Sequence, residues 1–219
     1  MIEAKMNSTV KRPAQRALLT FLVMAIAFVI APPQAAVGDN VSAVSFQAGD
    51  GWKITGTLYL PDNVSAPVPA VVLLTEPGWV DRSIYDNYLS RKLAKNGMAA
   101  LSIDMRGTGG SAGGKEFEAF SPEELAKLQL DVSGAIKYLS AQKSIDPHRI
   151  GIVGSGVTAN YAIAEATDNA AVQAIVLISG DLNSHSMELV RTRLEIPAFF
   201  IAGKKDRKSL EQMAAAYAA

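Results

Sequence analysis

The stretch 149–160, which reads Arg-Ile-Gly-Ile-Val-Gly-Ser-Gly-Val-Thr-Ala-Asn, constrains the fold more than any other part of the sequence. Its apolar run 150–153 is rich in β-branched residues, which is typical of a parallel strand covered on both faces of a sheet. Gly154 and Gly156 permit the backbone angles of a tight turn, and Thr158 is placed to cap a helix that follows. The stretch therefore predicts a buried strand, a sharp turn and a helix in immediate succession.

Strand-like and helix-like segments alternate along the rest of the chain. The strand-like segments are 41–46, 52–60, 70–74, 98–103, 172–179 and 197–202, and the helix-like segments are 84–95, 121–141, 159–166, 187–193 and 209–219. The Gly-Asp-Gly sequence at 49–51 indicates an antiparallel hairpin between the first two strands. Strands that alternate with helices predict an α/β fold, with a mostly parallel central sheet, helices on both faces and ligands at the carboxyl ends of the strands.

The first 38 residues have the pattern of a secretory signal peptide. Four basic residues precede the uncharged apolar run 17–31, and small residues at 36–38 form an acceptable cleavage site. An uncleaved anchor is the alternative, but this run is short against the roughly 20 residues that span a bilayer. We therefore expect residues 1–38 to be a signal peptide and residues 39–219 to be a single domain. The mature protein would then be periplasmic or secreted, with no stable membrane anchor.

Composition excludes several classes of function. Lys plus Arg and Asp plus Glu number 21 each, so no net charge favours binding to nucleic acid. The absence of Cys excludes a disulfide framework, a thiol nucleophile and thiolate metal sites. No His, Asp and Glu residues have metal-ligand spacing, and the glycine-rich stretch 107–114 lacks the Lys-Ser/Thr ending of a phosphate-binding loop. We expect neither a cofactor nor a metal.

Five ordered pieces of sequence carry a resemblance to a known family. They are the strand 71–74 after the hairpin, and the segments 93–97, 102–107, 146–151 and 197–206. In this order and spacing the chain resembles the α/β-hydrolase superfamily, and is similar to its small dienelactone-hydrolase-like or serine-peptidase-like members. The resemblance implies an α/β-hydrolase-type sandwich, kinship with carboxylic ester, lactone or peptide hydrolases, and a structural role for Asp104 and Arg106. It also implies a final strand that follows the terminal helix and that this sequence does not contain.

The nucleophile motif implied by this resemblance, Gly-x-Ser-x-Gly, is altered. Aligned from the strand, Gly154 is the first glycine, Gly156 holds the nucleophile position and Thr158 replaces the last glycine. Ser155 therefore stands one place too early. Taking Ser155 as the nucleophile would put bulky Val157 where the strained turn needs a small residue. We interpret Ser155 as a turn residue and retain it as the candidate nucleophile.

The other members of a catalytic triad are incomplete in the sequence. Asp206 stands where the superfamily carries its acid, although it could equally cap the helix that follows. The superfamily's histidine follows the final strand, which is absent. His148 precedes the elbow strand at the wrong edge of the sheet, whereas His185 lies on the correct edge and could in principle approach Ser155. The candidate triad is thus Ser155, His185 and Asp206.

The region expected to stabilise an oxyanion is also altered. After the strand 71–74 the sequence reads Thr-Glu-Pro-Gly-Trp, so that Glu76 and Pro77 stand near the donor position. Proline has no amide hydrogen to donate. Losing one such donor typically lowers the rate roughly 100- to 1,000-fold.

Three hypotheses about function follow. The first is an exported hydrolase-fold protein with degraded or incomplete catalytic machinery. The second is an active serine hydrolase using Ser155, and the third is a protein that binds a small ester-like molecule in the old substrate cleft without turnover. Because the final strand is missing, the strand 197–202 would leave an open edge, through which we expect self-association.

Overall fold

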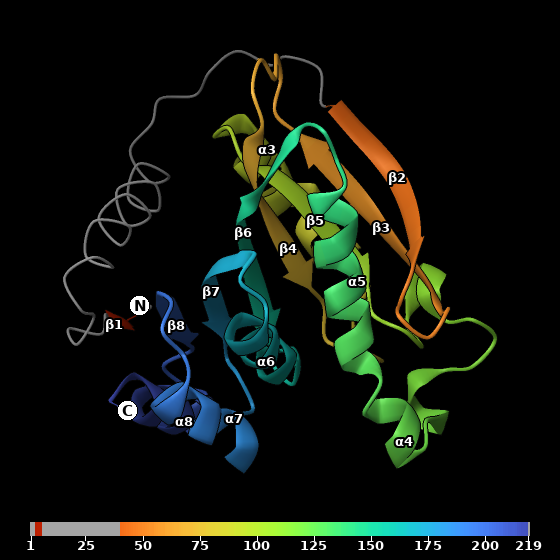
Figure 1. The fold of residues 1–219 in the computed structure, drawn as a ribbon. Helices are drawn as coiled ribbons and strands as arrows, with labels where there is room; N and C mark the ends of the chain where they lie inside the picture. Colours follow the sequence, from red (N-terminus) through yellow and green to blue (C-terminus); the bar gives the residue numbers. More distant parts are fainter. Residues whose placement is uncertain (1–2, 6–39, 219) are drawn as a thin grey trace.

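A computed structural model of the protein describes residues 3–5 and 40–218 (Figure 1). These residues form one eight-stranded sheet in the order β1-β8-β7-β6-β4-β5-β3-β2. Neighbouring strands from β5 through β4, β6 and β7 to β8 are parallel, whereas β2, β3 and β1 pair antiparallel. The strands are β1 (Glu3–Lys5), β2 (Asn40–Gln47), β3 (Lys53–Leu60), β4 (Val68–Leu74), β5 (Ala99–Asp104), β6 (Ile145–Ser155), β7 (Val172–Ile178) and β8 (Ala198–Ala202).

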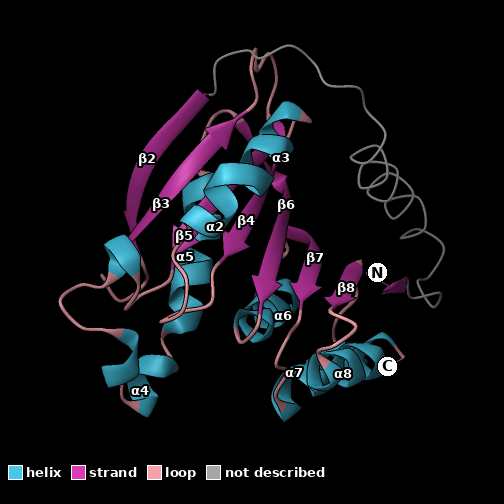
Figure 2. Cartoon of the chain, turned by 180° about the vertical axis from the view of Figure 1, so that it is seen from behind, coloured by secondary structure: helices cyan, strands magenta, loops and turns pink. Residues whose placement is uncertain are grey.

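Helices cover both faces of this sheet, as the sequence predicts (Figure 2). The helices are α2 (Ser83–Tyr85), the π-helix η1 (Asp86–Ser90), α3 (Arg91–Lys95), α4 (Pro122–Leu125), α5 (Leu128–Ser140), α6 (Thr158–Asp168), α7 (Ser184–Thr192) and α8 (Arg207–Tyr217), with 3₁₀ turns η2 (Gly109–Ser111) and η3 (Phe117–Ala119). The predicted α/β-hydrolase-type sandwich with its N-terminal antiparallel hairpin is therefore confirmed. None of these helices is long and apolar enough to cross a bilayer.

The alternation of side chains along the central strands divides the core into two layers. In β4, Val72 and Leu74 pack in the larger layer beneath α5 and α6, while Val71 and Leu73 face α3 and pack around its Leu93. All four strand residues are buried because β4 lies in the middle of the sheet. This is why the strand reads as an uninterrupted apolar run in the sequence.

The helix predicted at 121–141 is two helices in the structure. Ser121 and Glu124 form the reciprocal hydrogen bonds of a capping box at the start of α4, as the sequence indicates. However, α4 ends at Leu125, and α5 begins at Leu128. A capping box fixes where a helix begins and carries no information about where it ends, so the break is not visible in the sequence.

The edge of the sheet that the sequence predicts to be open is paired in the structure. Residues Glu3–Lys5 pair antiparallel with β8, so that Glu3 lies opposite Ala202 and Lys5 opposite Phe200. Phe200 is buried, with 6% of its surface exposed. An edge strand carries unpaired N–H and C=O groups that any extended segment can satisfy, and here the N-terminus does so. Three residues of the predicted signal peptide therefore pair with the sheet. Residues 6–38 lie outside the described residues, so the signal peptide itself stays a prediction.

A buried arginine joins three parts of the fold. Arg106, just beyond β5, donates to Asp131 of α5 from Nε at 2.8 Å and Nη2 at 2.6 Å, and to Asp50 of the β2–β3 hairpin from Nη1 at 2.8 Å. Burial acts to lower the pKa of Arg106, but the hydrogen bonds to Asp50 and Asp131 outweigh it and leave this pKa raised. Hydrogen bonds from Arg106 also lower the pKa of Asp50. The expected structural role of Arg106 is confirmed.

Removing this arginine should destabilise the protein strongly. Arg106→Ala leaves the buried carboxylate of Asp131 without its cation, and breaking a buried pair in this way costs about 3–5 kcal/mol in the free energy of unfolding. The matched control is Arg193→Ala, which breaks an exposed pair with Asp168 at 2.7 Å and should cost about 0–1 kcal/mol. Urea denaturation measures both. Equal losses in the two variants would contradict the role assigned to Arg106.

Candidate active site

The carboxyl end of β6 forms a sharp elbow that leads into α6. Gly156 follows the strand with a φ of +54°, a left-handed conformation that favours glycine. Its N–H donates to the carbonyl of Ile178 at 3.1 Å, and its carbonyl accepts from the N–H of Asp181 at 3.1 Å. Gly154 serves a different purpose, because a Cβ there would lie 2.8 Å from the carbonyl oxygen of Thr158. The first glycine permits close packing of the strand and the helix, and the second makes the turn.

Thr158 does not cap α6, contrary to the sequence prediction. The helix begins at Thr158 itself, with Val157 at the N-cap position and no side-chain cap. The Thr158 hydroxyl instead turns back to the strand, where it accepts from the N–H of Ser155 at 2.9 Å and donates to its carbonyl at 2.8 Å. These two bonds fix the elbow by clamping the last residue of β6 to the first turn of α6.

The carboxylate of Glu76 occupies the space above Gly156. A Cβ at position 156 would lie 2.5 Å from Cδ and from both carboxylate oxygens of Glu76. Sheet register explains this contact, because β4 and β6 are parallel neighbours with Leu74 opposite Gly154, so that the residues two places beyond each of this pair lie together. The point at which a side chain at position 156 would begin is therefore occupied by a carboxylate from the turn that follows β4.

Ser155 is the last residue of β6 and not a turn residue. Its Oγ accepts from the hydroxyl of Tyr85 at 3.3 Å and lies 3.5 Å from the carbonyl oxygen of Leu74. Burial raises the pKa of Tyr85; the hydrogen bond to Ser155 opposes this rise and the charge of Glu76 adds to it. Ser155 is thus paired with a tyrosine hydroxyl, which holds its own proton at neutral pH and cannot serve as its base.

The structure does not assemble the predicted triad. His185 lies exposed in the first turn of α7, His148 lies exposed near the start of β6, and among the described residues neither ring hydrogen-bonds to Ser155. Asp206 caps α8 by accepting from the N–H of Ser209 at 3.2 Å. Hydrogen bonds with Ser209 lower the pKa of Asp206. The capping interpretation of Asp206 is the one that the structure supports.

The predicted oxyanion region forms a turn rather than a set of donors directed at the elbow. The carbonyl of Glu76 accepts from the N–H groups of Trp79 and Val80, each at 3.3 Å. Pro77 is buried, while Trp79 is 84% exposed. Within the described residues no hydrogen bond or ion pair engages the half-buried carboxylate of Glu76.

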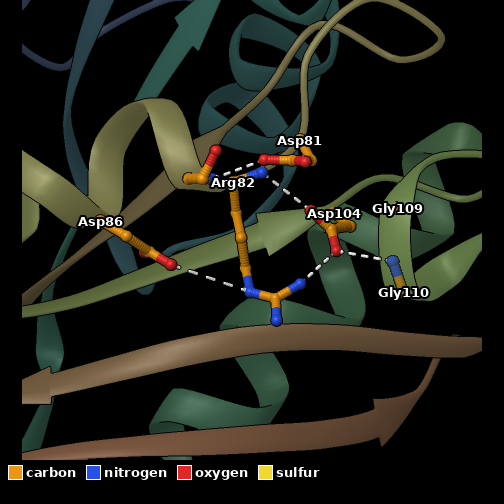
Figure 3. A pocket seen from close by; sticks show the side chains of 7 residues that line it. Asp81, Arg82, Asp86, Asp104, Gly109 and Gly110 are labelled. Carbon is orange, nitrogen blue, oxygen red and sulfur yellow. Dashed lines mark hydrogen bonds and ion pairs between the residues drawn. The ribbon is translucent and has the colours of Figure 1, made fainter.

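A polar pocket of about 210 Å³ lies at the carboxyl edge of the sheet (Figure 3). The Arg82 side chain crosses it toward Asp104, a fully buried residue at the end of β5. Asp104 also accepts from the N–H of Arg82 at 2.8 Å and from the N–H of Gly110 at 2.9 Å. These bonds confirm the structural role expected of Asp104, which holds two loops at this edge. The pocket is lined by Asp81, Arg82, Ser83, Asp86, Asp104, Gly109 and Gly110.

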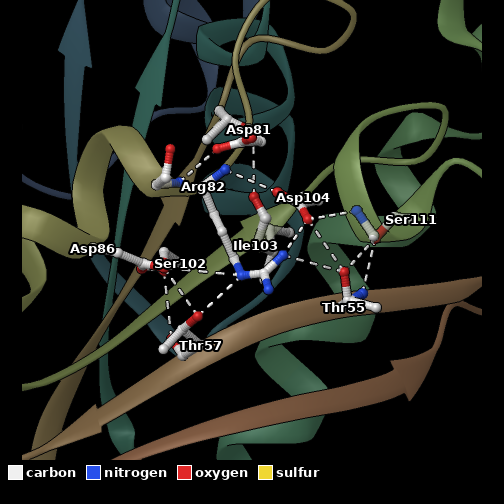
Figure 4. Close-up of polar contacts among 12 residues, drawn as sticks. Thr55, Thr57, Asp81, Arg82, Asp86, Ser102, Ile103, Asp104 and Ser111 are labelled. Atoms are coloured by element: carbon white, nitrogen blue, oxygen red, sulfur yellow. Dashed lines mark hydrogen bonds and ion pairs between the residues drawn. The ribbon is translucent and has the colours of Figure 1, made fainter.

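The polar side chains around this pocket form hydrogen bonds with one another (Figure 4). Asp86 accepts from the hydroxyls of Ser102 and Thr57, the latter at 3.0 Å, and Arg82 Nε donates to Thr57 at 2.9 Å. This network connects the start of η1 to β3 and β5. No three His, Asp or Glu residues in the described part of the chain are arranged to hold a metal ion.

Sequence reasoning misses two features of the site. Tyr85 falls within a helix-like segment and gives no local sign that its hydroxyl reaches Ser155, which lies 70 positions away. The sequence indicates Glu76 only as part of an altered oxyanion region. The sequence does contain one sign of this contact. Glu76 lies two residues beyond Leu74, and Gly156 lies two residues beyond Gly154, its partner on the neighbouring parallel strand.

Comparisons with known proteins identify the family and the fold of this chain. Residues 54–216 match the model of the dienelactone hydrolase family. A polyketide transferase from Penicillium crustosum is 28% identical over 124 residues, 57% of this chain and 39% of that protein. A thiohydrolase from Aspergillus aculeatus is 31% identical over 137 residues, 63% of this chain and 41% of that protein. The chain thus spans less than half the length of these relatives.

The fold also matches a solved structure over most of both chains. The crystal structure of a dienelactone hydrolase from Anabaena variabilis superposes with a TM-score of 0.68 at 20% sequence identity. The superposition covers 82% of this chain and 81% of that one. At this identity the likeness establishes the shared fold.

The contact between Glu76 and Gly156 can be measured by a double-mutant cycle. Gly156→Ala should lower the free energy of unfolding in two ways. The left-handed backbone at this position should cost about 1–2 kcal/mol, and the clash of the new Cβ with Glu76 about 1–3 kcal/mol more. Gly114→Ala is the control for the backbone cost, because Gly114 has a φ of +83° and no atom within 4 Å of the point where a Cβ would stand. In a Glu76→Ala background the second part of the cost should vanish. An unchanged cost in that background, measured by urea denaturation, would show that Glu76 lies elsewhere.

Proposed function

Because this chain belongs to the dienelactone hydrolase family, we propose that it holds a small ester-like molecule at the carboxyl edge of its sheet without forming an acyl-serine intermediate. The observation that carries this proposal is the elbow itself. Gly156 has no side chain to attack a carbonyl, and the carboxylate of Glu76 fills the space where such a side chain would stand. On this proposal the hydrolytic machinery of the family is incomplete.

The surroundings of Ser155 support the same proposal. A serine nucleophile needs a neighbouring base that is oriented by a third group. Ser155 has Tyr85 and a backbone carbonyl as its neighbours, and Asp206 is engaged as a helix cap. The named activities of the two relatives, a polyketide transferase and a thiohydrolase, favour an acyl ester or thioester as the ligand.

We also propose that the protein is exported to the periplasm or beyond, with residues 1–38 removed. The basic, apolar and small-residue pattern of this segment supports export. Cleavage would separate Glu3–Lys5 from β8, with which they pair. The edge of β8 would then be free to pair with a second copy of the chain.

A fluorophosphonate probe tests the chemistry, because it labels only an activated serine. We expect no adduct on Ser155 by mass spectrometry. We expect Ser155→Ala to change any turnover of p-nitrophenyl acetate by less than about tenfold, the effect of one weak hydrogen bond. Loss of a true serine nucleophile would cost roughly a millionfold. Labelling of Ser155 together with such a loss would establish the alternative, an active serine hydrolase.

Light scattering tests the exposed edge. The chain beginning at residue 39 should show a mass that increases with concentration, since β8 has lost its partner strand. A synthetic peptide of residues 1–8 in excess should reduce this association by occupying the edge, whereas a scrambled peptide of the same composition should not. A monodisperse monomer at all concentrations would contradict the proposal.

A further inference from the structure

We propose that the Glu76 carboxylate is the catalytic base of this site and activates a water molecule to attack the carbonyl carbon of a bound ester, lactone or thioester. This inference rests on the proposed function, because water is needed as the attacking group only if no side chain takes that role. Glu76, in the turn after β4, would supply the attacking water that replaces the missing side chain of Gly156 in the β6 elbow.

The position of the carboxylate is the first reason. Both oxygens of Glu76 lie 2.5 Å from the point at which a side chain at Gly156 would begin. The elbow holds this point at the carboxyl edge of the sheet, where open parallel sheets bind their ligands. A water molecule hydrogen-bonded to Glu76 would therefore lie close to where a nucleophilic side-chain atom would stand.

The availability of the carboxylate is the second reason. Asp104 accepts from the N–H groups of Arg82 and Gly110 and from the side chains of Arg82 and Thr55, so its lone pairs are occupied. Asp131 is likewise engaged by Arg106. Among the described residues none donates to the carboxylate of Glu76, which is half-buried and still reaches solvent. A base must have a free lone pair within reach of the proton that it takes.

Tyr85 provides the hydroxyl that such a reaction also needs. Its single hydrogen is within reach of two acceptors, Ser155 Oγ at 3.3 Å and the carbonyl oxygen of Leu74 at 3.4 Å, both well beyond the optimum of about 2.7–2.8 Å for O–H···O bonds. These long bonds are weak and can be exchanged for one to a substrate. Burial raises the pKa of Tyr85, so the hydroxyl keeps its proton at neutral pH and can donate to a developing oxyanion.

The reaction balances with water as the only co-reactant. Glu76 takes one proton from water while the water oxygen bonds to the carbonyl carbon, and Tyr85 donates a hydrogen bond to the resulting oxyanion. The bond from carbon to the leaving oxygen or sulfur then breaks, and the leaving group takes the proton from the Glu76 carboxylic acid. The products are a carboxylic acid and an alcohol or thiol, and Glu76 is again a carboxylate.

The test compares three variants on p-nitrophenyl acetate, dihydrocoumarin and S-phenyl thioacetate. Glu76→Gln keeps the shape of the side chain but removes the base, so kcat/KM should fall at least about 100-fold on the best of the three substrates. Glu76→Asp keeps a carboxylate and should retain part of the activity. Glu118→Gln is the matched control and should leave the activity unchanged. Glu118 is an exposed glutamate that lies beside Gly78, a residue of the turn that also contains Glu76.

Intact-mass spectrometry during turnover and thermal unfolding complete the experiment. We expect no acyl adduct on the protein and unfolding temperatures for the Glu76 variants close to that of the unchanged chain. Full activity in Glu76→Gln, an acyl adduct on Glu76, or no turnover above buffer by the unchanged chain would each overturn the inference while leaving the proposed function standing. An adduct on Ser155 would instead overturn the proposed function.

Discussion

The buried guanidinium of Arg106 is the interaction on which the arrangement of this protein depends. Its two carboxylate partners come from the β2–β3 hairpin and from α5, two elements that lie on either side of it in the sequence. Burying a charge is costly unless its hydrogen bonds are satisfied, so the bonds to Asp50 and Asp131 also dictate where these elements lie. Asp104, two residues earlier, likewise positions the loops at Arg82 and Gly110.

These ionic contacts fix the loops at the carboxyl edge of the sheet. The candidate site lies at the same edge. Parallel pairing of β4 with β6 places the residues beyond each strand side by side, so that Glu76 covers Gly156. Thr158 clamps the elbow, and Tyr85 approaches Ser155 from the helical segment that follows β4. The strand–turn–helix geometry of a hydrolase elbow is thus kept, and the group over its glycine comes from the turn that follows β4.

The role proposed for Glu76 would give a hydrolase fold a reactive group without a nucleophilic side chain at its elbow. Function depends on the groups in a site and not on the fold alone. A glycine at the elbow removes covalent catalysis through that position and at the same time creates the space that the Glu76 carboxylate occupies. The absence of a side chain at position 156 and the position of the Glu76 carboxylate are thus both explained by one glycine.

Much of this protein could be predicted from its sequence, because the relevant signals are local. Apolar runs define the central strands, glycines define the elbow, and the absence of a side chain at Gly156 is visible without a structure. The contact of Glu76 with Gly156, the bond between Tyr85 and Ser155 and the pairing of Glu3–Lys5 with β8 were decided by the tertiary structure. Each joins residues far apart in the sequence, and depends on sheet register and on the direction of a side chain. Neither quantity is specified by periodicity or by the local preference of the backbone, since both are set only when the strands pair and the helices pack against them.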